Sequence, residues 1–435
     1  MADQLLYSQS MPKTDRSGLS EYPTLSLKER ERRWGLVRKM MAQNNLEALI
    51  SIPGGAWDDP SNYLTNYLWP RHGITVFFPL QGEPVAFGVF HLLAVDTLLK
   101  SESYGIDSWV RDWRYAQGTP ENWVALLKEK GLIRGRIGIA ANGHFSRATQ
   151  MLVANALMSA IKEALPDVSF VDVWDQLVDI WIVKDAEEIA MFRKASLATE
   201  VASEEFVLAC RPGNTVADVQ NAFMSALLPY SIDIWRSEVS SEPDGGRGIL
   251  WMGNGIKPPV IRKGHLVCTE FFAYAGPLHA QAQITVSVGE PSAEKKKLAA
   301  VARECYEIGL KTLRPGIPFA MLAEALGGPL KREGLWHLSP LAHTMNPHAG
   351  VTNVTEGMRG PVGFTGVNER FGNVKLPEHG IERPDLLIRE GMVLQFEPNA
   401  CKGRTYVNIG GNVLVTKDGC EELNKIPTRM IVVPA

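Results

Sequence analysis

The chain has 435 residues, 45% of them hydrophobic, which is enough for two domains that each bury a core. Lysine and arginine number 45 against 48 aspartates and glutamates, a formal net charge of −3. This composition excludes a disordered linker, a disulfide-stapled miniprotein and a basic nucleic-acid-binding protein. We also expect no membrane partner and no export, because no run of 18 apolar residues and no signal-like N-terminal segment occurs.

The cysteines are few and widely spaced. They stand at positions Cys210, Cys268, Cys305, Cys401 and Cys420. An odd number without a CxxC pair or a zinc-like spacing indicates a reduced, cytoplasmic protein.

The first half of the chain predicts an α/β domain. Residues 1–25 are polar and contain two prolines, which predicts an extended N-terminal arm. From residue 26 to 180, helical patterns alternate with short apolar runs. The predicted helices cover 28–41, 92–100, 121–130 and 147–164, and the predicted strands cover 48–53, 74–78, 85–89 and 137–140.

The second half, 184–435, predicts an α+β domain. A helix begins near Lys184, with acidic residues in its first turn and basic residues after them, as the helix dipole favours. Further helices are predicted over 216–228 and 293–313, and strands over 266–274, 279–288, 392–398 and 406–415. We expect the strands to be antiparallel, with polar side chains toward one face.

The strand 279–288 has two chemically different faces. With a period of two, His279, Gln281 and Gln283 share one face, and the other face is small and apolar. We therefore expect this strand to be packed on one side only, with its polar face lining a cavity.

Two carboxylates, Glu270 and Glu397, stand in otherwise apolar predicted strands. A buried carboxylate without a partner is costly. One explanation is an ion pair with lysine or arginine at the strand ends, and the other is a shared polar pocket suited to proton transfer.

Several stretches resemble the creatinase and Xaa-Pro aminopeptidase family, peptidase family M24. They are 184–196, 264–270 (Gly-His-Leu-Val-Cys-Thr-Glu), 284–289, 391–398 (Gly-Met-Val-Leu-Gln-Phe-Glu-Pro) and 413–419. The resemblance implies a pita-bread catalytic domain over 184–435, preceded by a creatinase-type α/β domain over 26–180.

Metallopeptidases of this family hold two divalent metals with two aspartates, a histidine and two glutamates. By resemblance, the aspartate positions are Glu270 and Gln281, and the glutamate positions are Glu397 and Gly410. The histidine position is not identified by its motif, and the candidates are His343, His348 and His379. Since hard dications need anionic oxygen ligands, we expect no dinuclear metal site.

Creatinase is the precedent in this family for hydrolysis without metals. Its working residues correspond to Gly253 beside Asn254, to Gln283 and to Glu397, so this sequence keeps one of three. The resemblance therefore implies a site that hydrolyses without metals, and it does not imply creatine as the substrate.

The segment 67–73 (Tyr-Leu-Trp-Pro-Arg-His-Gly) resembles a creatinase segment that reaches into the active site of the other subunit. In a homodimer, Arg71 would then bind a substrate carboxylate and Trp69 would cover an apolar or cationic part. The alternative is a surface arginine and a core tryptophan.

The leading hypothesis is a metal-independent, creatinase-like hydrolase that cleaves a C–N bond in a small polar or carboxylated substrate. Glu397 and Glu270 would be acid and base, His279 or His343 would move the proton, and Gln281 and Gln283 would bind the substrate. One alternative is a metal-dependent Xaa-Pro peptidase or lyase with one divalent ion (Mn, Fe, Co or Zn) on Glu270, Glu397 and a histidine. Another is a non-catalytic binding protein of the same fold.

Overall fold

A computed structural model describes most of the chain. The described residues are 5–52, 60–67, 74–88, 95, 99, 103, 105–115, 119–141, 147–232, 234–241, 257–335, 337, 340–348, 351–352, 381, 383–402 and 405–435. The predictions for Trp69, Arg71, Gly253, Asn254 and His379, and for most of the helix 92–100, lie outside these residues.

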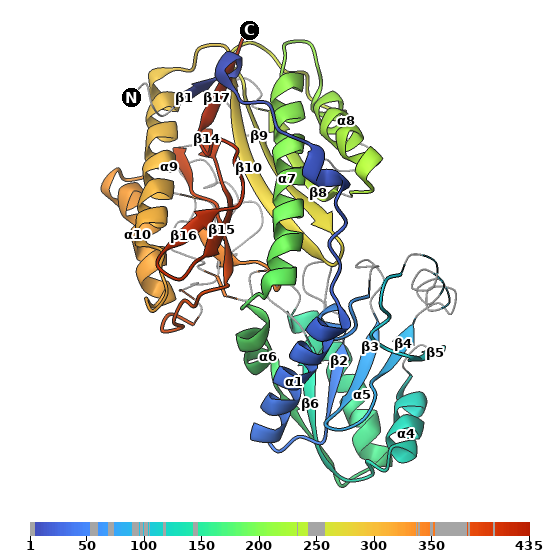
Figure 1. Cartoon of the computed structure of the whole chain (residues 1–435). Helices are drawn as coiled ribbons and strands as arrows, with labels where there is room; N and C mark the ends of the chain where they lie inside the picture. Colours follow the sequence, from blue (N-terminus) through green and yellow to red (C-terminus); the bar gives the residue numbers. More distant parts are fainter. Residues whose placement is uncertain are drawn as a thin grey trace. The chain divides into compact units, whose positions relative to one another are not determined.

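The chain divides into two units. The N-terminal unit comprises Pro23–Glu188 with Asn346–Gly350, and the C-terminal unit comprises Met1–Tyr22, Ile189–Met345 and Val351–Ala435. In Figure 1 the colours follow the sequence, so the first unit is mainly blue to teal and the second mainly green to red, with the blue residues of the N-terminus added to it.

The N-terminal unit is built on a six-stranded mixed sheet in the order β5-β4-β3-β2-β6-β7. The strands are β2 (Ala48–Ile52), β3 (Thr75–Pro79), β4 (Val85–Gly88), β5 (Asp112–Tyr115), β6 (Gly135–Ala141) and β7 (Val168–Asp172). The helices are α1 (Leu27–Gln43), α2 (Pro60–Thr65), α4 (Pro120–Glu129), α5 (Arg147–Ala164) and α6 (Trp174–Trp181). Helices and strands are therefore interspersed along this unit, as the sequence predicts, with β3 and β4 directly following each other.

Alternate side chains of the central strands point to opposite faces of this sheet. Phe77 belongs to a buried cluster with residues of α4 and α5, including Trp123 and Leu126. Its neighbour Phe78 meets Trp34 of α1 edge-on, with ring centroids 5.6 Å apart. The sheet thus has helices on both faces.

The C-terminal unit contains a five-stranded sheet in the order β1-β17-β10-β9-β8 and a four-stranded sheet in the order β11-β12-β15-β16. The strands are β1 (Leu5–Tyr7), β8 (Ile234–Ser241), β9 (Leu266–Ala275), β10 (Leu278–Val288), β11 (Ala342–Thr344), β12 (Val393–Phe396), β15 (Gly411–Val415), β16 (Cys420–Glu422) and β17 (Met430–Val433). A separate hairpin consists of β13 (Asn399–Lys402) and β14 (Thr405–Asn408).

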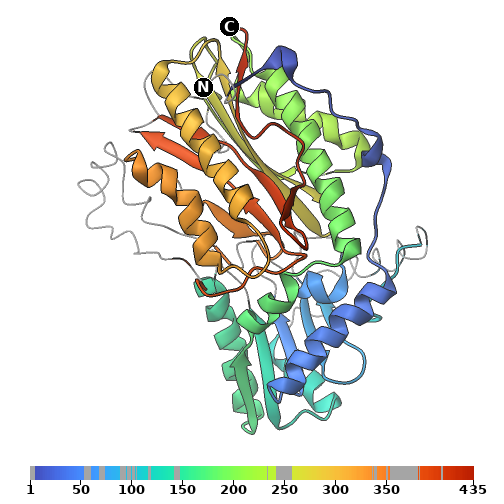
Figure 2. The same cartoon turned by 60° about the vertical axis from the view of Figure 1, so that its left-hand side comes forward.

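Helices flank these strands on both sides (Figure 2). They are α7 (Ala186–Ala209), α8 (Val216–Leu227), α9 (Ala293–Thr312) and α10 (Phe319–Arg332), with short 3-10 turns at Ser8–Ser10, Ser17–Ser20 and Leu228–Tyr230. The apolar faces of α7 and α8 pack against the five-stranded sheet in a cluster that includes Phe206, Phe223 and Phe271. Helix α9 contacts the hairpin of β13 and β14.

Three expectations from the sequence need correction. The strands are not all antiparallel, because β17 is parallel to both β1 and β10. The predicted strand 406–415 is two strands, separated at Ile409 and Gly410, where Gly410 instead bridges to Gln283 of β10. Strand β10 is buried along its whole length, so it is covered on its polar face as well as its apolar face.

Candidate functional site

The polar face of the five-stranded sheet brings three predicted residues together. Glu270 lies on β9, and Gln281 and Gln283 lie on β10, with Gln283 directly opposite Glu270 in the antiparallel register. The intervening residues Ala282 and Ile284 belong to the apolar cluster under α7 and α8. The predicted alternation along β10 is confirmed.

Glu397 and His343 come from the other sheet. Glu397 directly follows β12, and His343 lies on β11 opposite Gln395 of β12. Glu397 is 4% exposed and His343 is 1% exposed. Both sheets therefore supply side chains to one cluster, buried except for the half-buried Glu270. We call it the carboxylate–amide cluster: Glu270, Gln281, Gln283, His343 and Glu397.

Amide groups join the two carboxylates. Gln281 Nε2 donates hydrogen bonds to Glu270 Oε1 at 2.7 Å and to Glu397 Oε2 at 2.8 Å. Gln283 Nε2 donates a second hydrogen bond to Glu397 Oε2. An N–H donor between two carboxylates offsets their mutual repulsion, so both glutamates can lie close together. Among the described residues, amide groups therefore lie against both glutamates, as the hypothesis of a shared polar site requires.

His343 presents a defined nitrogen to Glu397. Its Nδ1 lies 2.9 Å from the carbonyl oxygen of Thr344, which can only accept, so Nδ1 carries a proton. Its Nε2 lies 3.5 Å from Glu397 Oε1. In the neutral ring this Nε2 is an acceptor, so a proton can be shared between it and the Glu397 carboxyl group.

The residues that the resemblance places at the family's metal positions fit a dinuclear metal centre poorly. The Nε2 group of Gln281 lies within 2.8 Å of an oxygen of each glutamate and donates to both, where a bridging aspartate would offer negative oxygens. At Gly410, a Cβ atom would lie 2.3 Å from the Phe396 carbonyl oxygen and 3.0 Å from Glu397 Cα. No glutamate can replace this glycine without a shift of the backbone.

The other histidines lie in different surroundings. The ring of His279 is fully buried and packs against Phe272 and Tyr274, with centroid distances of 5.9 and 5.1 Å. His348 is buried in the turn that follows β11. Of the two histidines predicted to move the proton, the structure places His343 beside Glu397.

Sequence reasoning placed Gln395 on the face of Glu397 without a role, and it did not single out Asn412. Asn412 Oδ1 accepts a hydrogen bond from the backbone N–H of Gln281 at 2.8 Å, and Asn412 Nδ2 donates to Gln395 Oε1 at 3.0 Å. Both side chains are fully buried. The available signal was a polar amide inside each of two apolar strands, because a buried amide needs hydrogen-bond partners.

A second group of carboxylates lies in the N-terminal unit. Oxygens of Glu29, Asp185 and Glu188 lie within 4.8 Å of one another, close enough to hold a metal ion. However, Arg32 and Arg33 each form ion pairs with both Glu29 and Glu188. Glu29 and Glu188 are therefore paired with guanidinium groups, and we interpret the group as a structural ion-pair cluster.

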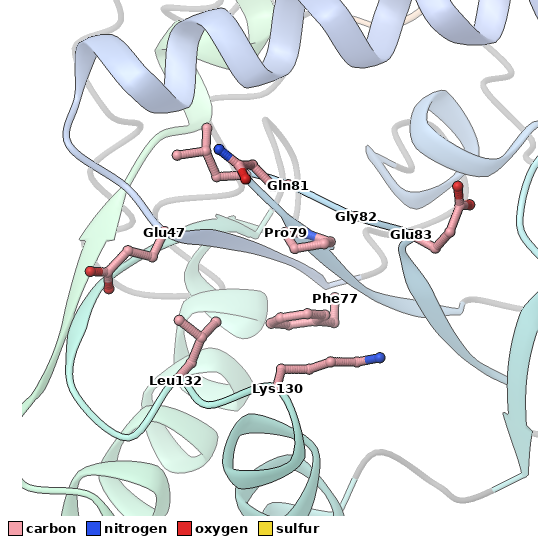
Figure 3. A pocket seen from close by; sticks show the side chains of 9 residues that line it. Glu47, Phe77, Pro79, Gln81, Gly82, Glu83, Lys130 and Leu132 are labelled. Carbon is pink, nitrogen blue, oxygen red and sulfur yellow. The ribbon is translucent and has the colours of Figure 1, made fainter.

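A pocket of about 340 Å3 lies at one end of the N-terminal unit's sheet (Figure 3). Phe77, Pro79 and Leu132 form its apolar floor, and Glu47 and Lys130 are among its charged residues. It shares no residue with the carboxylate–amide cluster.

Comparison with known proteins identifies the family. The model of metallopeptidase family M24 matches residues 190–417, which is more than half of the chain and includes every member of the carboxylate–amide cluster. The chain belongs to metallopeptidase family M24. The predicted resemblance and the pita-bread fold of the C-terminal domain are both confirmed.

Individual M24 relatives are distant. A probable dipeptidase PepE of Mycobacterium bovis is 24% identical over 263 residues, which cover 60% of this chain and 63% of the relative, less than two thirds of its length. An ectoine hydrolase of Halomonas elongata is 23% identical over 427 residues, covering 91% of this chain and 95% of the relative. The crystal structure of dipeptidase PepE from Mycobacterium ulcerans superposes with a TM-score of 0.69 at 19% identity, over 95% of this chain and all of the other.

Proposed function

We propose that the C-terminal unit hydrolyses a C–N bond in a small polar substrate, with Glu397 as the group that takes and returns a proton. The observation that carries this proposal is the position of the Glu397 carboxylate. One oxygen is held by the amides of Gln281 and Gln283, and the other faces His343 Nε2 at 3.5 Å. A carboxylate that is fixed on one side and faces an imidazole on the other suits general acid–base catalysis.

In this proposal, Glu397 removes a proton from a water molecule as the water oxygen attacks the electrophilic carbon. The C–O bond forms, the C–N bond breaks, and the proton returns to the leaving nitrogen from Glu397 or through His343. Glu270 stays linked to Glu397 through Gln281 Nε2 and provides a negative charge that stabilises a cationic substrate or transition state. Water is thereby split between the two products, and no other reactant is needed.

The donor set supports a mechanism without a dinuclear metal centre. Of the four family ligand positions that can be aligned, two are carboxylates, one is the neutral Gln281 and one is Gly410. A single metal ion on Glu270, Glu397 and His343 would still have three donors, and the match to a metallopeptidase family favours that alternative. A peptidase or lyase with one such ion therefore remains the second candidate.

Buried amide oxygens support a substrate rich in N–H groups. Gln281 Oε1 and Gln283 Oε1 are buried and accept no hydrogen bond within the described part of the chain. A buried acceptor without a hydrogen bond is unfavourable in free energy, so a ligand that donates to both oxygens would gain affinity by satisfying them. Guanidino and amidine groups carry such donors and a positive charge that complements Glu270 and Glu397. The similarity to a protein named as an ectoine hydrolase supports a hydrolase that need not act on a peptide.

We further propose a homodimer in which Arg71 and Trp69 of one subunit contact the substrate bound by the other. The support is the resemblance of the segment 67–73. Five free cysteines, four of them buried, support a cytoplasmic location. Within the described residues no helix is both long and apolar enough to cross a membrane.

The function is tested with full-length protein purified without added metal. Elemental analysis gives the metal content, and turnover is measured on guanidino acids, cyclic amidines, N-acyl amino acids and Xaa-Pro dipeptides. We expect less than stoichiometric metal and chelator-resistant hydrolysis of a guanidino or amidine compound. Stoichiometric Mn, Fe, Co or Zn with chelator-sensitive peptide cleavage would establish the second candidate instead. Binding of these ligands without turnover would indicate a binding protein.

A further inference from the structure

Three amino acids form a row across the four-stranded sheet at the level of the carboxylate–amide cluster. In the antiparallel register, His343 of β11 lies opposite Gln395 of β12, and Gln395 lies opposite Asn412 of β15. Directly opposed residues of an antiparallel sheet point to the same face. Asn412 therefore lies on the face of the sheet that also presents His343 to Glu397.

Strand β10 needs a partner at this level. The backbone N–H of Gln283 donates to Gly410 O at 3.2 Å, and Gly410 N–H donates to Gln283 O at 2.9 Å, which forms one isolated bridge between the two sheets. At Gln281, two residues earlier, no strand takes up the N–H. The side-chain oxygen of Asn412 accepts it instead, at 2.8 Å. The N–H groups of two alternate residues of β10, Gln281 and Gln283, are thus hydrogen-bonded to the β14–β15 segment.

The backbone of Asn412 is itself fixed. Asn412 N–H donates to Asn424 Oδ1 at 2.6 Å, and Asn424 Nδ2 donates to the Thr199 hydroxyl group. That hydroxyl group donates to Ser196 O at 2.7 Å within α7. All of these side chains are buried. A continuous set of hydrogen bonds therefore runs from α7 through Asn412 to the residue whose amide joins both glutamates.

We infer that Asn412 is a positioning residue for the proton-transfer site, acting through Gln281. It sets the position of the Gln281 backbone relative to the sheet that carries Glu397 and His343. A backbone displacement of about 1 Å would remove the paired donation from Gln281 Nε2, and misplacements of that size cost about 100-fold in rate. The inference rests on the proposed function only for its kinetic consequence, because the hydrogen-bond relation itself can be measured without turnover.

The structural test is backbone amide exchange at Gln281. In Asn412→Leu, which has the same branched shape and no acceptor, we expect exchange at Gln281 to be at least 10-fold faster than in the wild type. In Asn412→Asp, which keeps an acceptor oxygen, we expect the protection to be retained, since Gln395 Nε2 has no acceptor within the described residues and can turn toward the new carboxylate. Unchanged exchange at Gln281 in a folded Asn412→Leu protein would overturn the inference. If Asn412→Leu does not fold, loss of protection at Gln281 in Asn412→Asp would overturn it.

The kinetic test is a double-mutant cycle with Gln281→Met. We expect Asn412→Leu to lower kcat at least 10-fold with KM within about 2-fold, and Asn412→Asp to restore most of kcat. If Asn412 acts through Gln281, the double variant is no slower than Gln281→Met alone. If instead the double variant loses kcat by the product of the two single reductions, Asn412 has only an independent structural role. If the wild type has no hydrolase activity, the proposed function fails, while the exchange measurement still decides the role of Asn412.

Discussion

Glu397 has different partners on its two carboxylate oxygens. The amides of Gln281 and Gln283 both donate to Oε2, while Oε1 faces His343 Nε2 at 3.5 Å. The amide donors stabilise negative charge on the glutamate, and the imidazole offers a second position for a proton. The residue is therefore suited to exchange a proton, and replacement by its own amide should separate chemistry from binding.

Glu397→Gln should lower kcat by about 100- to 10,000-fold, the range found for loss of a general acid or base. Binding of a cationic ligand, measured by calorimetry, should weaken far less than kcat falls, because the side-chain shape is kept and Glu270 retains its negative charge. A matched control is Glu294→Gln, which removes an exposed carboxylate that pairs only with Lys402 among the described ion pairs. A fully active Glu397→Gln enzyme would make Glu397 structural and refute the proposed mechanism.

Gly410 shows how closely the backbone approaches the cluster. Its missing side chain leaves room for the Phe396 carbonyl group, which would lie 2.3 Å from a Cβ atom. Because the neighbouring atoms are backbone, they cannot rotate away as a flexible side chain can. This glycine therefore allows β10 and the β14–β15 segment to form their isolated bridge.

We expect Gly410→Ala to lower the free energy of unfolding by about 3 kcal/mol, the upper part of the usual range for overpacking. Gly419→Ala is the control, since a Cβ atom at that position meets no atom within 4 Å and its φ is not positive. Urea denaturation of both variants measures the difference. Equal stability of the two variants would show that the segment at Gly410 shifts at little cost.

At the scale of elements, hydrogen bonds from Ser26 to the Glu187 carboxylate link the start of α1 to the start of α7. Ser26 caps α1, and its N–H and hydroxyl groups both donate to Glu187 at 2.7 Å. Asp185 and Glu188 form a reciprocal cap at the start of α7, with Glu188 N–H donating to Asp185 Oδ1 at 2.9 Å. Burial, with the nearby carboxylates, raises the pKa of Asp185 to about 6.

This pKa shift makes a stability prediction with a definite sign. Since the folded pKa lies above the ordinary value of 3.8, Asp185 binds its proton more tightly in the native state. The stability that comes from this tighter proton binding is complete below about pH 3.8 and is lost as the pH rises through about 6. Asp185→Asn keeps a capping side chain and removes the charge, so its stability relative to the wild type should increase between pH 4 and pH 7.5.

Asp185→Ala is the matched control for the cap. Its free energy of unfolding should fall by about 1 kcal/mol at every pH, because the hydrogen bond to Glu188 N–H is missing. Its stability relative to the wild type should also rise with pH as in Asp185→Asn, because the same charge is removed. Denaturation of the three proteins at several pH values separates the two contributions. A stability difference between Asp185→Asn and the wild type that does not vary with pH would contradict the raised pKa.

At the scale of the whole molecule, the two ends of the chain meet in one sheet. Leu5–Tyr7 of β1 pair in parallel with Met430–Val432 of β17, which in turn pairs with β10. The arm expected at 1–25 therefore contributes a strand to the C-terminal unit, and Leu6 packs against its main apolar cluster. Figure 1 shows β1 beside β17 near the C-terminus.

Removal of residues 1–10 should uncover the edge of β17. We expect a lower midpoint of thermal unfolding and faster aggregation, because an exposed edge offers unpaired N–H and C=O groups to other chains. Removal of residues 1–4 alone keeps β1 and is the control. Equal midpoints and equal light scattering for the two truncated proteins would show that β1 adds nothing to the sheet.

The sequence alone is enough to predict the family, most of the helices and strands, and the faces of β9 and β10. These properties depend on local patterns: a period of two places Glu270 opposite the apolar face, and the segment 391–398 that contains Glu397 resembles the family. It did not determine that Gln281 Nε2 lies between Glu270 and Glu397, or that His343 rather than His279 lies beside Glu397.

The contacts of Gln281 and His343 depend on how two separate sheets approach each other, and no local pattern encodes that approach. Gln281 and Glu397 are 116 residues apart in sequence, and Gln281 and Asn412 are 131 apart. The space available at Gly410 likewise depends on the Phe396 carbonyl group of another strand. Strand periodicity gives the direction of a side chain within one sheet, whereas its partner across the interior is fixed by packing between the layers.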